Sequence, residues 1–131
     1  MPLDPEDAVE GWAQRIEQQT SLTTELSERL QRVTGFAESP GGDATVTVDH
    51  SGGLADLRLS DRAMRLPAAE LAGVIMATSR QAQAVLARRV AELVGGMYGS
   101  DSATATFIGG TYAAQFPEPA DDDQDEERDR R

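Results

Sequence analysis

The sequence contains no cysteine and no lysine, and it has few aromatic residues: one Trp, two Tyr and three Phe among 131 residues. The absence of cysteine excludes disulfides and thiolate chemistry, together with most kinds of zinc site. No run of about 18 apolar residues occurs, and no charged-then-apolar leader opens the chain. These absences predict a cytoplasmic protein with one domain and a modest core. Pairing with a second copy would bury more of its surface.

The net charge is −11, and all 12 basic residues are arginine. Such acidity argues against nucleic acid as a ligand, because duplex affinity depends largely on basic residues that displace phosphate counterions. The charge is uneven, however. Residues 117–131 hold eight acidic residues and three arginines, a net charge of −5, whereas residues 68–97 have a net charge of +1. The overall sign therefore leaves DNA binding open.

Two long stretches have the apolar spacing of amphipathic helices. Residues 6–33 keep their apolar side chains on one face, and a helix of that length would span roughly 42 Å. A small domain needs less, so part of this helix is expected to project or to pack on a partner. Residues 68–97 form the second helical pattern, which Pro67 would begin and the glycine pair at 95–96 would weaken.

Between these helices the pattern changes to that of strands. Runs at 33–38, 45–49 and 57–59 are predicted strands, and the glycine pair at 52–53 joins the last two as a hairpin. A three-stranded sheet with one apolar face needs a helix to cover it. The predicted fold is therefore α+β: a helix, a three-stranded antiparallel meander and a helix. Core or dimer contacts are expected from Trp12, Ile16, Leu26, Leu30, Val46, Val48, Leu57 and Leu59.

The chain divides into three predicted segments. Residues 1–98 form the folded domain, and residues 99–116 form a Gly- and Ala-rich extension with a few aromatic residues as tethers. Residues 117–131 form a charged tail with almost nothing to bury, which predicts disorder.

No enzyme signature is present. His50 is the single histidine, and it lies in a Gly-rich turn without a predicted acid–base partner. The glycine pairs at 41–42 and 52–53 do not precede a helix as phosphate-binding loops do, so turns explain them. The acidic run at 121–123 lacks the preorganised geometry of a selective cation site. We therefore predict no catalytic residue, cofactor, metal site or small-molecule substrate.

Four arginines are the candidate ligands of an anionic partner. At about 100° per residue, Arg80 and Arg88 point away from the apolar stripe of the second helix. Arg89 falls within that stripe, so it must snorkel, pair with a carboxylate or lie at an edge. Arg15 lies on the first helix. Ordinary surface arginines are the alternative interpretation of Arg80 and Arg88, and a core or dimer contact is the interpretation of Trp12.

Several motifs in succession resemble the YbaB/EbfC family: a V-T-G-F-A-E-S strand, a Gly-rich turn, V-T-V-D, G-L-A-D-L-R-L and a final helix with spaced alanines. The resemblance covers residues 6–97, and the composition, rich in Ala with Arg as the only basic residue, is similar to that of actinobacterial proteins. It implies a dimer with joined sheets and projecting helices that binds duplex DNA at the nucleoid. Arg80, Arg88, Arg89 and Arg15 would then contact DNA, mainly through its backbone.

A second resemblance leads to a different function. The chain is similar to the EspL-like group associated with type VII secretion, whose members resemble cytoplasmic partners or stabilisers of secreted proteins. The first helix is acidic, and long amphipathic helices offer apolar grooves to partner helices. Two hypotheses remain at this point: a DNA-binding homodimer, or a protein-interaction module without DNA binding.

Overall fold

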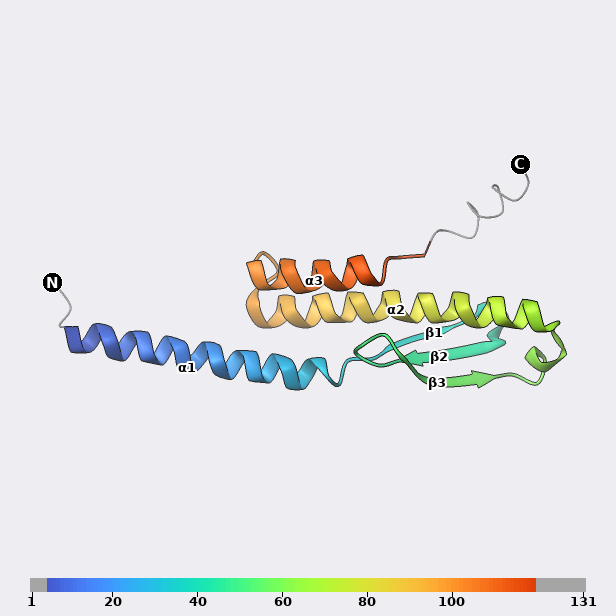
Figure 1. Ribbon diagram of the computed structural model, residues 1–131, viewed down its shortest axis with the longest axis horizontal. Coiled ribbons are helices and arrows are strands. Elements are labelled where there is room, and N and C mark those ends of the chain that lie inside the picture. The colour runs from blue at the N-terminus through green and yellow to red at the C-terminus, as the bar shows by residue number, and fades with distance from the viewer. Residues whose placement is uncertain (1–4, 120–131) are drawn as a thin grey trace, which may run out of the picture.

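The computed structural model describes the backbone of residues 5–119 and the side chains from Gly11 onward, apart from those of Trp12 and Gln19. The expected contact of the Trp12 side chain and nearly all of the predicted tail therefore lie outside the described residues. The described chain forms three α-helices and three strands (Figure 1). In chain order these are α1 (Pro5–Leu30), β1 (Gly35–Glu38), β2 (Ala44–Val48), β3 (Leu54–Leu59), α2 (Ala68–Tyr98) and α3 (Ala103–Gln115).

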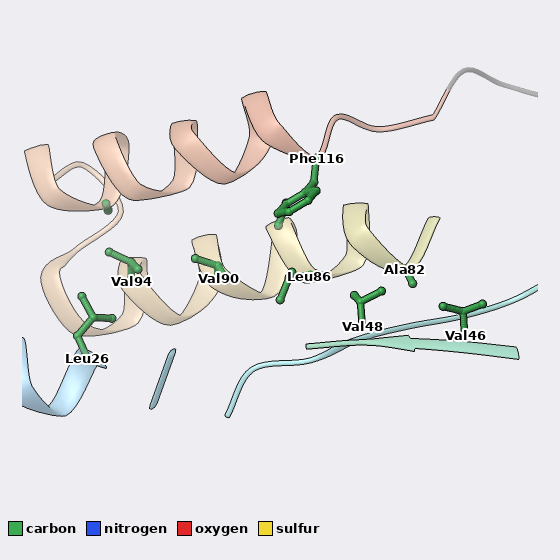
Figure 2. Packing of buried hydrophobic residues seen from close by; sticks show 10 residues of the cluster. Leu26, Val46, Val48, Ala82, Leu86, Val90, Val94 and Phe116 are labelled. Carbon is green, nitrogen blue, oxygen red and sulfur yellow. The ribbon is translucent and has the colours of Figure 1, made fainter. Parts of the chain in front are cut away.

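The strands form one antiparallel sheet in the order β1-β2-β3, which confirms the predicted meander. The alternation of β2 gives the sheet its apolar face, because Ala44, Val46 and Val48 are buried against α2 while the threonines between them are half-buried. Figure 2 shows Val46 and Val48 pointing toward Ala82 and Leu86 of α2. The fold is α+β, as predicted.

Gly35 allows α2 to lie close to the sheet. It pairs with Val48 and therefore faces α2. A Cβ atom at this position would clash with the backbone carbonyl of Ala82 and lie 2.9 Å from the backbone nitrogen of Leu86. The helix backbone thus packs directly on the strand backbone, and only a residue without a side chain fits there.

The β2–β3 turn is held by the carboxylate of Asp49. One oxygen accepts hydrogen bonds from the backbone nitrogens of Ser51 and Gly53, both at 3.0 Å, and from the Ser51 hydroxyl. These bonds, that of the Ser51 hydroxyl above all, lower the pKa of Asp49. Gly52 completes the turn with a φ of +84°, a conformation that favours glycine. The Gly-Gly signal in the sequence correctly located this hairpin.

Helix α1 projects away from the sheet, and its N-terminal part extends beyond both other helices (Figure 1). Near its C-terminal end, Leu26 is buried and Leu30 packs against the same core, which also contains Val94. Ile16, further out on the same apolar stripe, is 42% exposed. The helix ends at Leu30 rather than at the predicted residue 33. Among residues 5–119, none of the helices has an apolar stretch that could span a lipid bilayer.

Helix α3 is the element that sequence reasoning did not predict. The segment foreseen only as an extension contains 13 helical residues that stack on α2 (Figure 1). The Ser102 hydroxyl accepts a hydrogen bond of 3.0 Å from the backbone nitrogen of Ala105 and caps its start. Gly109 lies against Ala91, where a Cβ atom would be 3.5 Å from the alanine methyl. The glycine pair at 95–96 does not end α2, which continues to Tyr98.

Candidate nucleic-acid interface

The four predicted DNA contacts are all exposed, but the structure does not bring them into one patch. Arg80 lies on the outer side of α2 and makes no hydrogen bond or ion pair with any described residue. Arg15 lies on the projecting part of α1, where its Nε donates a 3.3 Å hydrogen bond to the carbonyl of Gly11. Each chain therefore presents its candidate arginines at separate positions on α1 and α2.

Arg88 already has an anionic partner. Its guanidinium forms an exposed ion pair with the carboxylate of Glu118, which lies just beyond α3. Sequence reasoning did not identify this pair, because 30 residues separate the two side chains and no local signal connects them. Arg80 and Arg88 thus differ, because Arg88 is paired with a carboxylate and Arg80 has no carboxylate partner among the described residues.

Arg89 reaches the other side of α2. Its Nη1 donates a 3.1 Å hydrogen bond to the backbone carbonyl of Thr34, at the junction of α1 and β1. The side chain is exposed, so it lies at the edge of the apolar stripe as one of the sequence alternatives required. Arg32 is exposed two residues before Thr34 and adds a second positive charge to this junction. Sequence reasoning did not include Arg32 among the candidates.

The arginines around β3 are largely neutralised within the chain. Arg58 pairs with Asp56 at 3.1 Å, and Arg62 binds Asp43 at 2.9 Å. The Arg62 guanidinium, acting first through its hydrogen bond, lowers the pKa of the Asp43 carboxyl. Arg65 is exposed and has no partner among the described residues. Arg58 and Arg62 are therefore less available to an external anion than Arg80, whereas Arg65 is as free as Arg80.

An uncovered apolar row lies on β3. The register pairs Leu57 and Leu59 with Val46 and Ala44, so both leucines are on the face of the sheet that α2 covers, and Leu54 pairs with Val48 beyond an irregularity in the register. Helix α2 packs over β1 and β2, however, and Leu54 remains 56% and Leu59 36% exposed. Met64, just beyond the strand, is also exposed. Since β3 is an edge strand, its outer backbone groups have no partner strand within the described chain.

Five of the residues predicted to make core or dimer contacts lie in the hydrophobic core or pack against it. Val46 and Val48 are fully buried, Leu26 is buried, and Leu30 and Leu57 pack against the same cluster. No group of three side chains able to hold a metal ion lies together in the described part of the chain. His50 contributes its backbone rather than its imidazole, because its carbonyl accepts a hydrogen bond of 3.0 Å from the Tyr112 hydroxyl.

Comparison with known protein families gives one match. The sequence model of the YbaB/EbfC DNA-binding family matches residues 7–101, which comprise most of α1, the sheet and α2 but not α3. A search of curated proteins found no match. The family match favours the DNA-binding hypothesis and adds no support to the adaptor hypothesis.

Proposed function

Because this chain belongs to the YbaB/EbfC DNA-binding family, we propose that it binds duplex DNA as a homodimer, mainly through the sugar–phosphate backbone, and performs no catalysis. The proposal places the protein at the nucleoid. Besides the family match, the observation that carries it is Arg80: an exposed guanidinium on α2 without a described carboxylate to neutralise it.

Contacts with phosphates follow from the chemistry of the available side chains. An arginine guanidinium donates hydrogen bonds in a planar fork that matches two phosphate oxygens. Arg80 and Arg88 are eight residues apart on α2, which separates them by about 12 Å along the helix. Spaced cations of this kind hold a duplex without reading its base edges, so sequence preference is expected to be modest.

One chain offers few arginines to DNA, and a dimer would double their number. The exposed leucines of β3 and the open edge of that strand support an interface in which two sheets join. Pairing there would cover the apolar row and satisfy the outer backbone groups of the strand. The dimer would then present each candidate arginine twice, on helices that project from a shared sheet.

The dimer is tested by changing Leu54→Asp together with Leu59→Asp. In an isolated chain both residues are already exposed, so the substitution is expected to cost little stability. In the proposed dimer it would bury two unpaired carboxylates per chain, which is strongly unfavourable. Light scattering should give about twice 14.0 kDa for the parent protein and a single chain for the variant.

A matched control is Phe107→Asp, which places the same charge on an exposed apolar residue of α3. It is expected to leave the dimer intact. A parent protein that is monomeric at tens of micromolar, or a double variant that stays dimeric, would contradict the proposed interface.

DNA binding is tested by Arg80→Glu, alone and with Arg88→Glu. The double variant should weaken duplex binding at least about tenfold near 50 mM salt, because each lost phosphate contact also reduces counterion release. The slope of the logarithm of the binding constant against the logarithm of salt concentration should become shallower by about 1 for each phosphate contact removed. Arg80→Glu alone removes two contacts per dimer, so it should change this slope by about 2. Fluorescence anisotropy at about 50 and 200 mM salt measures both quantities.

The control for this experiment is Arg65→Glu, which changes the net charge equally at another exposed arginine. It should reduce affinity far less than Arg80→Glu. Equal losses in the two variants would mean that overall charge, rather than a site on α2, governs binding.

A further inference from the structure

The segment that follows α2 is fastened to the body at the β2–β3 turn. The Tyr112 hydroxyl donates to the carbonyl of His50 at 3.0 Å. Phe116 is only 8% exposed, and its ring fills the space beside Gly52, where a Cβ atom would lie 2.5 Å from Cε1 of the ring. Figure 2 shows this ring pointing from the end of α3 toward α2. The end of α3 therefore has a fixed position over the middle of α2.

This attachment brings the next acidic residue to Arg88. A single residue separates Phe116 from Glu118, whose carboxylate pairs with the Arg88 guanidinium. Pro117 and Pro119 flank the glutamate; a proline fixes its own φ and restricts the residue before it to extended conformations. The short connection thus loses little conformational freedom when the ion pair forms.

An isolated exposed ion pair contributes little free energy. The pair of Arg88 and Glu118 is supported by the anchor at Phe116 and by the negative charge of the segment that follows α3. Glu118 is the first of eight acidic residues in 117–131, a segment with a net charge of −5. Attachment at Phe116 keeps the Glu118 carboxylate at a high effective concentration beside Arg88. Carboxylate oxygens also accept the same bidentate hydrogen bonds from arginine that phosphate oxygens accept.

We infer that the C-terminal extension is an intramolecular competitor of DNA: α3 and Phe116 anchor it, and the Glu118 carboxylate occupies Arg88 in place of phosphate. Duplex binding through α2 then requires displacement of this segment. The inference rests on the proposed function, since it assigns regulation to the same arginine.

The inference is tested in the full-length chain, with duplex DNA as the ligand and anisotropy as the measurement. Glu118→Gln should tighten binding about two- to fivefold, the range expected for one exposed ion pair. Changing all eight acidic residues of 117–131 to their amides should tighten binding at least about tenfold, through the local contact together with reduced repulsion of phosphate. The matched control is Glu70→Gln, which removes one negative charge from an exposed position on α2.

A double-mutant cycle separates local competition from long-range charge. In an Arg88→Gln background the gain from Glu118→Gln should disappear, because no guanidinium remains to be released. A gain that persists in this background, or one that Glu70→Gln reproduces, would overturn the inference. So would equal DNA affinity of the parent and the eight-amide chain. Absence of DNA binding in every variant would instead contradict the proposed function itself, so the two failures are distinguishable.

Discussion

The variant Gly35→Ala is expected to separate α2 from the sheet and to destabilise the fold by about 3 kcal/mol, at the upper end of the usual cost of overpacking. The added methyl group would meet backbone atoms of Ala82 and Leu86 rather than a side chain that can rotate away. The whole helix would have to shift, and the contacts of Leu86 and Val90 with the sheet and the core would loosen with it. Urea unfolding followed by circular dichroism measures the loss.

Gly73→Ala is the matched control, since the same methyl group on the exposed side of α2 meets nothing within 4 Å. Alanine is favoured over glycine inside a helix by about 0.5–1 kcal/mol, so this variant should be slightly more stable than the parent. If both variants had similar stability, the close contact between α2 and β1 would not exist in solution.

Local patterns in the sequence were sufficient to predict α1, the three-stranded sheet and α2. The alternation of β2 and the glycine pair before β3 each have a direct physical meaning, because successive strand residues face opposite sides and a tight turn needs a positive φ. The second helix was located to within one residue at its end. The first helix was predicted three residues too long, since residues 31–33 continue as turns before β1 begins.

Helix α3 escaped prediction because its stability comes from tertiary contacts. Its sequence contains two adjacent glycines and two β-branched threonines in its first turns, and these residues have poor intrinsic helix propensity. The same glycines permit close packing, and Gly109 lies directly over Ala91 of α2. A short helix of this composition is stable only where a neighbouring helix supports it.

The candidate site was predictable in residue type but not in arrangement. Periodicity placed Arg80 and Arg88 away from the apolar stripe and Arg89 within it, whereas all three side chains are exposed in the structure. Their partners come from distant parts of the sequence, since Thr34 is 55 residues from Arg89 and Glu118 is 30 residues from Arg88. Only the packed fold determines which of these cations remains available, and of the three on α2 Arg80 alone makes neither an ion pair nor a side-chain hydrogen bond with a described residue.

The variant Phe116→Ala is expected to release α3 while the sheet and α2 stay folded. Truncation of a buried Phe costs about 3–5 kcal/mol, and the lower value applies here because the ring lies at the edge of the core. Loss of the ring would also leave the space beside Gly52 empty. The end of α3 could then move, and the hydrogen bond from the Tyr112 hydroxyl to the β2–β3 turn would weaken. Amide hydrogen exchange should therefore speed up throughout residues 103–116 and stay slow at Val46 and Leu86.

Phe107→Ala is the control on the same helix, because Phe107 is 75% exposed and its removal should leave exchange in α3 unchanged. If releasing α3 in this way also tightened duplex binding, the anchor at Phe116 would be linked directly to the competition at Arg88. Slow exchange in α3 of the Phe116 variant would show that other contacts hold the helix, Gly109 on Ala91 foremost among them.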